Sequence, residues 1–280
     1  MSNDSAPLDD IRPSRRSFLF GTLISAASLA LPPRWSWAAS SAYLSGVKAL
    51  TFDMQGTVFD FYDPISAKAK AIGERLGLAQ DWAVTLAGDW SSAAHDIIVE
   101  ISAQRRPWVS NTEVYREALG PLLAKRGVQN ILTNSHREEL LSVWGQMIPW
   151  RDAQAGLAQL RQKYTLATLT NAAMSQMTAL VKGSGLPFDE ILTGELNKAF
   201  KPDPRVYRLA VDYTGFRADQ LLMVSAHKWD LRASRKAGFR TAYIPRPLEL
   251  GPGHAADTTP EEFIDVIATD LIDLANQLGA

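Results

Sequence analysis

The sequence predicts an α/β protein: a Rossmann-like core with a mainly parallel sheet, into which a helical cap is inserted. From residue 150 onward, helical segments alternate with short apolar runs, an order typical of parallel strands joined by right-handed crossovers and covered on both faces. A further apolar run, residues 47–52, is followed by a long stretch with helix signals and no convincing strand pattern. These observations place the helical stretch as an insertion after the first strand.

In the insertion, helices are expected at residues 66–78, 81–104, 112–126 and 136–147. Breaks at Gly77, at Pro107 and at Gly127 separate these helical patterns. Because the insertion follows the carboxyl end of the first strand, where ligands bind in such sheets, we expect it to cover the site as a lid.

In the core, strands are expected at residues 47–52, 165–170, 190–194, 221–225, 241–245 and 266–269. The helices between and after them are expected at residues 153–163, 174–183, 204–213, 231–237 and 271–278. We therefore expect residues 43–63 and 151–280 to form the core domain and residues 64–150 the cap domain.

Composition narrows the function classes. The chain has 280 residues, of which 46% are hydrophobic and 21% are charged, enough for a full core. The net charge of −1 and the lack of a long basic run argue against nucleic acid as a partner. Without cysteine there is no disulfide, thiol nucleophile or cysteine-bound zinc, and the 4 histidines are too widely spread to suggest a metal cluster.

The first forty residues differ from the rest. Ser14-Arg15-Arg16-Ser17 opens a short apolar run that ends at Pro32-Pro33 and leads into the small residues 38–42. This order is typical of an export signal, and the paired arginines resemble the twin-arginine signal. Residues 1–42 are therefore predicted to be a twin-arginine signal peptide that directs the folded protein to the periplasm. The alternative is a mobile N-terminus with a chance arginine pair.

The first strand ends on a charge, which needs an explanation. A buried carboxylate is costly unless something pairs with it, so Asp53 must be either a cap or a chemical reagent. Thr170-Asn171 and residues 225–230 lie at the carboxyl ends of two other expected strands. Because ligands bind beyond the carboxyl ends of parallel strands, one crevice is expected to collect all of these side chains.

Four motifs in these places resemble the haloacid dehalogenase superfamily, and more closely its type II 2-haloacid dehalogenase branch. They are FDMQGTVFD at 52–60, LTNA at 169–172, KPDPRVY at 201–207 and VSAHKWD at 224–230. The resemblance covers about residues 47–278, nearly all of the chain after the predicted signal. One motif alone is a weak signal, whereas four in order are specific.

The resemblance implies catalytic roles for two of these residues. Asp53 matches the nucleophile, which displaces halide from the carbon next to a carboxylate and forms an ester that water then cleaves. Lys201 matches the lysine of the family. A carboxylate attacks well only when it is dry, aligned and kept ionised by a nearby cation, which an ammonium group supplies. Alternatively, Lys201 is a solvated lysine before a turn.

The remaining matched positions are implied to orient these groups, the substrate and the attacking water. Substrate-binding candidates are Thr57, Thr170, Asn171, Gln55 and Trp229. Further catalytic candidates are Ser225, His227 and Asp230, where His227 stands at a position that holds asparagine or histidine in the family. For Thr170 a helix cap is an equal alternative, and a lone histidine is more often structural.

Two departures from the family pattern keep alternatives open. Phosphatases of the superfamily carry a second aspartate two residues after the nucleophile and bind Mg²⁺, whereas this chain has Gln55, so no metal or other cofactor is expected. In the type II branch, an arginine follows a lid tryptophan, whereas Ser91 follows Trp90 here. Arg105 or Arg106 is a possible substitute, although solvated charge is the more common role.

The function expected is a hydrolase that releases halide from a small 2-halocarboxylic acid. A phosphatase-like hydrolase and a binding protein without turnover are the alternatives, because of Gln55 and Ser91. The expected partners are a small carboxylate substrate and the twin-arginine export machinery, and a homodimer is left open.

Overall fold

The computed structural model describes residues 44–252 and 255–280, all of which lie in one compact unit. The predicted signal peptide, residues 1–42, lies outside the described residues. No helix in the part of the chain that is described has the length and apolarity to cross a membrane.

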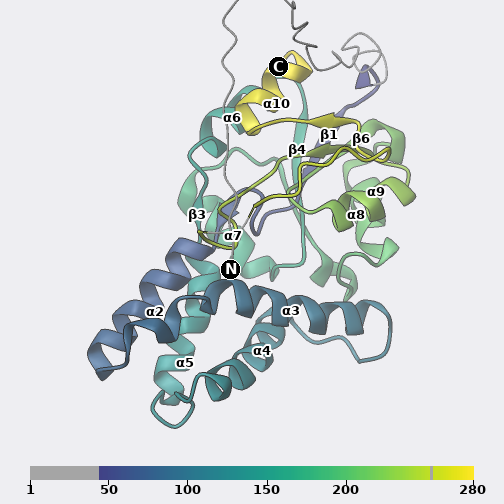
Figure 1. Cartoon of the computed structure of the whole chain (residues 1–280). Helices are drawn as coiled ribbons and strands as arrows, with labels where there is room; N and C mark the ends of the chain where they lie inside the picture. The colour runs from purple at the N-terminus through teal and green to yellow at the C-terminus, as the bar shows by residue number, and fades with distance from the viewer. Residues whose placement is uncertain (1–43, 253–254) are drawn as a thin grey trace, which may run out of the picture. The chain divides into compact units, whose positions relative to one another are not determined.

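The core is a parallel sheet of six strands in the order β5-β4-β1-β6-β7-β8 (Figure 1). Its strands are β1 (Ala49–Phe52), β4 (Thr165–Thr170), β5 (Glu190–Thr193), β6 (Leu221–Ser225), β7 (Arg240–Tyr243) and β8 (Val266–Ile267). The parallel pairing of β1 with both β4 and β6 puts their carboxyl ends side by side. The predicted α/β fold is confirmed.

Helices cover both faces of this sheet, because successive side chains of a strand point to opposite faces. Leu50 and Phe52 join a large apolar cluster with α6 (Ala153–Leu160), α7 (Met174–Ser184) and α10 (Leu271–Leu278). Ala49 faces a second cluster with α8 (Pro204–Thr214) and α9 (Lys228–Lys236). The strands are therefore buried on both sides, as their continuous apolar sequences predict.

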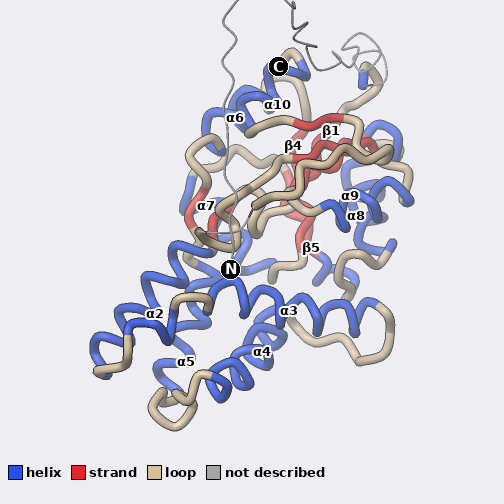
Figure 2. The backbone as a smooth tube through the Cα atoms, viewed as in Figure 1, coloured by secondary structure: helices blue, strands red, loops and turns tan. Residues whose placement is uncertain are grey.

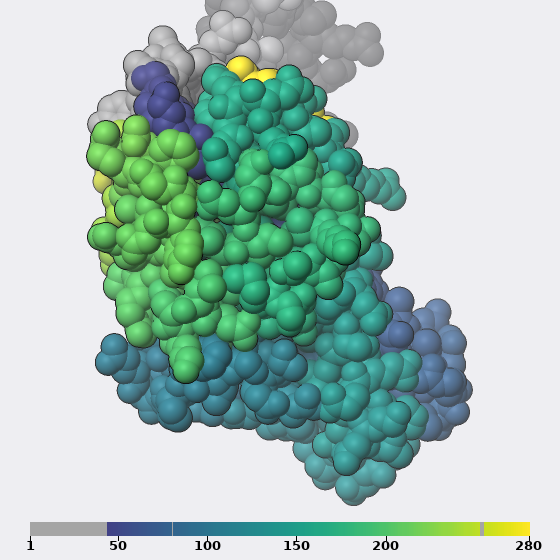
Figure 3. Space-filling model, turned by 180° about the vertical axis from the view of Figure 1, so that it is seen from behind, coloured from purple at the N-terminus to yellow at the C-terminus, as the bar shows by residue number. Residues whose placement is uncertain are grey.

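The insertion is helical, as predicted, and Figure 2 shows it as a group of helices separate from the strands. It consists of α2 (Tyr62–Leu76), η1 (Gln80–Ala83), α3 (Leu86–Ser102), α4 (Asn111–Lys125), α5 (Asn134–Leu141) and η2 (Ser142–Gly145). Seen from behind in Figure 3, the blue to teal residues of the insertion lie together on one side of the described part of the molecule. The division into separate core and cap domains remains a prediction.

A second, two-stranded sheet joins the insertion to the core, and it was not predicted from the sequence. Its strands β2 (Phe59–Asp60) and β3 (Ile148–Pro149) pair antiparallel where the chain enters and leaves the helices. Strands of two residues are too short to show a period. Asp60 then accepts hydrogen bonds from the backbone N–H groups of Tyr62 and Asp63 at 2.7 and 3.3 Å, which starts α2 four residues before the predicted position.

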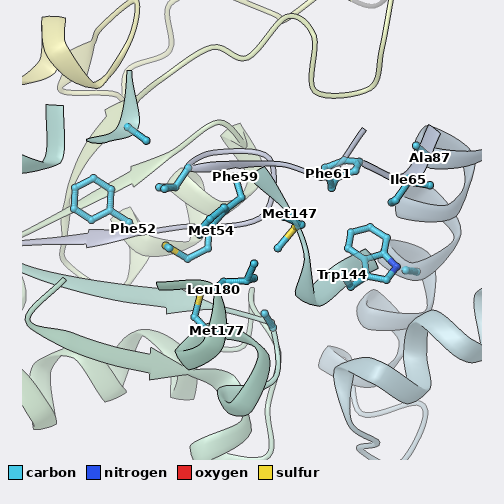
Figure 4. Packing of buried hydrophobic residues seen from close by; sticks show 14 of the residues in the cluster. Phe52, Met54, Phe59, Phe61, Ile65, Ala87, Trp144, Met147, Met177 and Leu180 are labelled. Carbon is cyan, nitrogen blue, oxygen red and sulfur yellow. The ribbon is translucent and has the colours of Figure 1, made fainter. Parts of the chain in front are cut away.

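Apolar side chains are continuous from the sheet into the insertion. Figure 4 shows Phe52 and Met54 beside Phe59, followed by Phe61 and Trp144 of the insertion. The Phe61 and Trp144 rings have centroids 5.4 Å apart. This packing holds the insertion against β1, the strand that Asp53 follows.

Candidate active site

Three adjacent strands bring several of the predicted site residues to one cavity of about 250 Å³. Asp53 follows β1, Asn171 follows β4 and His227 follows β6, and all three line the cavity. The helix α3 of the insertion supplies the opposite wall through Ser91 and His95. The expected crevice at the carboxyl ends of the strands, covered by the insertion, is therefore present.

A buried lysine bridges two buried carboxylates beside this cavity. Lys201 Nζ donates to Asp53 Oδ1 at 2.8 Å and to Asp230 Oδ2 at 2.6 Å, and the lysine side chain is only 1% exposed. Tyr207 OH donates to the other oxygen of Asp230 at 2.7 Å. Asp230 lies in the first turn of α9, where the exposed backbone N–H groups favour an acid. Asp230 therefore holds the ammonium in place, while Asp53 reaches the cavity.

The neighbouring charges determine the protonation states of Asp53 and Lys201. Burial alone would raise the pKa of Asp53, but the Lys201 ammonium, together with His227, holds that pKa well below its usual range. Burial would lower the pKa of Lys201, yet the carboxylates of Asp230 and Asp53 raise it. Asp53 is thus an ionised carboxylate in a nearly dry position, 6% exposed.

A turn after β1 fixes the second oxygen of Asp53. Thr57 Oγ1 donates to Asp53 Oδ2 at 2.7 Å and accepts from the N–H of Ala226 at 2.9 Å, so its proton is aimed at the carboxylate. Gly56 in the same turn has φ 84°, and a Cβ there would lie 2.3 Å from Oε1 of Glu249. Glycine is needed at this position both for the turn and for the approach of Glu249.

His227 lies between two carboxylates. Its Nδ1 is 3.1 Å from Asp53 Oδ2 and its Nε2 is 2.7 Å from Glu249 Oε1. Nδ1 is close to Asp53 without an aligned hydrogen bond, and the described part of the chain offers it no other hydrogen-bond partner. Burial alone would lower the pKa of His227, but Glu249 and Asp53 raise it well above its ordinary value.

Three of the predicted site residues accept hydrogen bonds from backbone N–H groups in this structure. Asn171 Oδ1 accepts from the N–H of Lys201 at 2.7 Å, which ties the loop of the lysine to the end of β4, and the amide also lines the cavity. Thr170 is 1% exposed and accepts from the Ala172 N–H at 3.2 Å, the geometry of a local turn. Ser225 likewise accepts from the N–H of His227 at 3.1 Å.

Aromatic and polar side chains complete the cavity wall. Trp229 stacks on His227 with ring centroids 5.7 Å apart and contacts the ring of His95 at 5.1 Å. Gln55 and Tyr115 line the cavity as well. Tyr115 was not singled out from the sequence, because a tyrosine on a helix of the insertion carries no motif.

Among the described residues, no arginine lines the cavity. Ser91 lines it where the resemblance would place a guanidinium. Arg105 and Arg106 pair with Glu100 and Glu117 at 2.7 Å on the surface and line a different hollow, so they do not replace the missing group. Within the described ranges, no three or more acidic or histidine side chains are arranged to hold a metal ion.

Glu249 is the functional candidate that the sequence did not reveal. It belongs to the loop after β7, outside all four motifs, and lines the cavity, while Arg246 anchors this loop to the core. Arg246 forms a two-pronged ion pair with Asp152, both contacts being 2.8 Å, and donates to Thr57 O at 2.9 Å. No local pattern marks such a long-range contact.

Known proteins resemble this chain in both sequence and fold. The haloacid dehalogenase-like hydrolase family matches residues 47–238. The (S)-2-haloacid dehalogenase 4A of Burkholderia cepacia is 26% identical over 210 residues, which cover 72% of this chain and 85% of the relative. The (S)-2-haloacid dehalogenase of Xanthobacter autotrophicus is 28% identical over 204 residues, covering 71% of this chain and 76% of the relative.

Solved structures agree with this. The crystal structure of an L-2-haloacid dehalogenase superimposes with a TM-score of 0.76 at 31% identity, covering 83% of this chain and 99% of that one. A defluorinating L-2-haloacid dehalogenase superimposes with a TM-score of 0.78 at 31% identity, over 84% and 96% of the two chains. Fold and sequence therefore point to the same family.

Proposed function

This chain belongs to the haloacid dehalogenase-like hydrolases, and on that premise we propose that it releases halide from a small 2-halocarboxylic acid through an ester on Asp53. The observation that carries this proposal is the Asp53 carboxylate, nearly dry and paired with Lys201, at the wall of a cavity of about 250 Å³. A space of this size suits a short carbon chain. The named relatives act on substrates of this kind.

The two oxygens of Asp53 have different surroundings and, we propose, different roles. Oδ2 faces two groups, the Thr57 hydroxyl at 2.7 Å and His227 Nδ1 at 3.1 Å. Within residues 44–252 and 255–280, Oδ1 accepts a hydrogen bond from Lys201 alone and keeps a lone pair for attack. Oδ1 attacks the carbon that bears the halogen, a carbon–oxygen bond forms as the carbon–halogen bond breaks, and halide leaves with the bonding electrons.

Water then cleaves the ester at the Asp53 carbonyl carbon. The oxygen of water bonds to that carbon, and the bond between Oδ1 and the substrate carbon breaks. One proton of the water goes to the new 2-hydroxy acid and the other leaves to solvent. Asp53 returns as a carboxylate that contains one oxygen atom from water.

The substrate carboxylate has donors available at the end of β4. The Asn171 amide lines the cavity, and its Nδ2 is 3.5 Å from Lys201 O, a weak contact that a substrate oxygen can replace. Because Ser91 supplies no charge, we expect the cavity to bind the substrate carboxylate more weakly than it would with an arginine at this position.

Halide release from a panel of short 2-haloacids, measured without added metal, tests the proposal. We expect release by the natural protein and none by the Asp53→Asn variant. In ¹⁸O-labelled water, a single turnover is expected to place the label in Asp53, which mass spectrometry of the peptide detects. Turnover that labels only the product would disprove the ester route.

Assays on the same preparation distinguish the proposed function from the two alternatives, a phosphatase-like hydrolase and a binding protein without turnover. A phosphatase-like hydrolase would cleave an aryl phosphate in a Mg²⁺-dependent way, and Gln55 argues against it because a neutral amide cannot protonate a leaving group. A binding protein would take up a small carboxylate without forming product, so ester formation at Asp53 would exclude it.

We also propose that residues 1–42 direct export by the twin-arginine route to the periplasm. The support is the sequence order of paired arginines, apolar run and small residues. A reporter fused behind this segment should reach the periplasm, and replacing Arg15 and Arg16 by lysine should retain it in the cytoplasm. Export of the lysine variant at the natural rate would contradict the proposal.

A further inference from the structure

The second half of the proposed reaction needs groups that stabilise a negative charge on Oδ2 of Asp53. When water adds to the ester, Oδ2 changes from a carbonyl oxygen to an oxyanion. Thr57 already donates to this atom at 2.7 Å. A second donor is His227 Nδ1, which lies 3.1 Å from Oδ2 and has no aligned partner. Such a donor is placed for the oxyanion rather than for the resting carboxylate, and hydrogen bonds of this kind often tighten only during reaction.

Nδ1 can donate in this way only if it carries a proton while Nε2 faces a carboxylate. Nε2 contacts Glu249 Oε1 at 2.7 Å, so a proton is needed on that nitrogen as well. An imidazole with an acceptor on each side is satisfied only as the doubly protonated cation.

We propose that Glu249 keeps His227 doubly protonated, so that His227 Nδ1–H stabilises the oxyanion formed at Asp53 Oδ2 during ester hydrolysis. This inference rests on the proposed function. Glu249 is a positioning residue in this scheme, since it acts through His227.

The structure shows that Glu249 is held for this contact. Its side chain is 15% exposed, and the absent side chain of Gly56 leaves the space that its carboxylate occupies. Arg246, three residues earlier, fastens the loop to the same turn that carries Thr57. The carboxylate that contacts His227 and the hydroxyl of Thr57 are therefore tied to the same turn.

The charged surroundings of His227 favour the cation. Carboxylates face it from two elements, Asp53 after β1 and Glu249 in the loop after β7. From α3, His95 faces it across Trp229, and burial together with the charge of His227 lowers the pKa of His95. His227 is therefore the charged imidazole, and the neighbouring His95 is the neutral one.

Glu249→Gln separates the two halves of the reaction. We expect a burst of about one halide per protein, followed by turnover slowed roughly 10–100-fold at about pH 8, because loss of one oxyanion donor costs about 10²–10³ in rate and a neutral His227 keeps part of its contact. The ester should accumulate and be visible in the intact mass. Turnover should recover as the pH falls, since the pKa of His227 drops without Glu249.

Two further variants control for structural effects. Glu249→Asp keeps the charge and should retain faster turnover than Glu249→Gln at about pH 8. Glu139→Gln removes a carboxylate that pairs with Arg75 at 2.6 Å within the insertion and does not line the cavity, so it should leave burst and turnover unchanged.

The ¹⁵N NMR signals of the His227 ring test the protonation without any substrate, and a His227→Asn sample assigns them. Both nitrogens should show the imidazolium signature at about pH 8 in the natural protein, and a neutral ring should appear in Glu249→Gln. A neutral ring in the natural protein, an unchanged cation in the variant, or loss of the burst together with turnover would each overturn the inference. If the natural protein released no halide, the proposed function would fail, while the NMR result would still decide the role of Glu249.

Discussion

Replacing Lys201 by methionine tests the central feature of the site, the ammonium between two buried carboxylates. At 2.8 Å and an effective dielectric constant of about 20, the attraction to Asp53 is roughly 6 kcal/mol before the cost of desolvation is subtracted. Removing one partner of a buried pair typically costs about 3–5 kcal/mol, because a charge remains buried without compensation. We therefore expect the free energy of unfolding to fall by about 3–5 kcal/mol.

Halide release should fall further than stability alone explains. Without the ammonium, burial raises the pKa of Asp53 and the carboxylate loses the partner that positions Oδ1, so we expect halide release to fall by roughly tenfold or more. Denaturant unfolding and halide release measured on the same preparation give both quantities. As a matched control, Lys68→Met removes a partly exposed lysine that is 3.8 Å from Glu139 and should change stability by less than about 1 kcal/mol.

A double variant separates folding from chemistry. Lys201→Met combined with Asp230→Asn removes the second uncompensated carboxylate, so part of the lost stability should return while halide release stays low. If Lys201→Met alone released halide within tenfold of the natural rate, a buried ammonium would not be what keeps the nucleophile ionised.

Three further predictions concern the cavity. Ser91→Arg should lower the KM for a 2-haloacid by roughly 10–100-fold, since a charge-assisted hydrogen bond contributes about 1.5–3 kcal/mol. The KM is measured in steady-state assays. An unchanged KM would show that the side of the cavity formed by residue 91 does not contact the substrate. Gly56→Ala should destabilise the protein by about 1–2 kcal/mol, because its φ is 84° and the new Cβ would collide with Glu249; thermal unfolding should show a Tm lower by roughly 2–8 °C. Because the pKa of Asp53 is depressed in the folded protein, its charge stabilises the fold above its unfolded pKa of about 3.9, and this contribution is lost only as the pH falls through the lower folded value. The rate of halide release should therefore show no acid limb centred near pH 4, and such a limb in a rate profile would contradict the assigned environment.

The fold was largely predictable because its strands are short and buried on both faces. Residues 165–170 and 221–225 form strands with the predicted bounds, and residues 271–278 form the predicted last helix. The expected helix at 136–147 is wrong in its second half: α5 ends at Leu141, and a 3₁₀ turn follows. Periodicity alone does not reveal where tertiary packing ends a helix.

Some residues of the candidate site could likewise be predicted from the sequence, and others could not. Asp53, Lys201 and Asp230 were singled out because each lies in a local motif. Asp53 directly follows β1, Lys201 lies in the loop before α8, and Asp230 lies in the first turn of α9. Glu249 was missed because its contact with His227 spans 22 positions of sequence and depends on the Arg246 anchor and on the space above Gly56. Such a contact exists only once the turn after β1 and the loop after β7 have been brought together.

The environment of Asp53 favours the two half-reactions unequally. Lys201, Thr57 and His227 all stabilise its negative charge, which keeps the carboxylate ionised but also makes it less reactive toward carbon. Once the ester has formed, Thr57 and His227 draw electron density from its carbonyl and assist the attack of water. Greater positive charge at Oδ2 therefore slows the first step and speeds the second. Glu249 sets that charge through His227, so the balance between halide release and ester hydrolysis is controlled from a loop outside the four motifs.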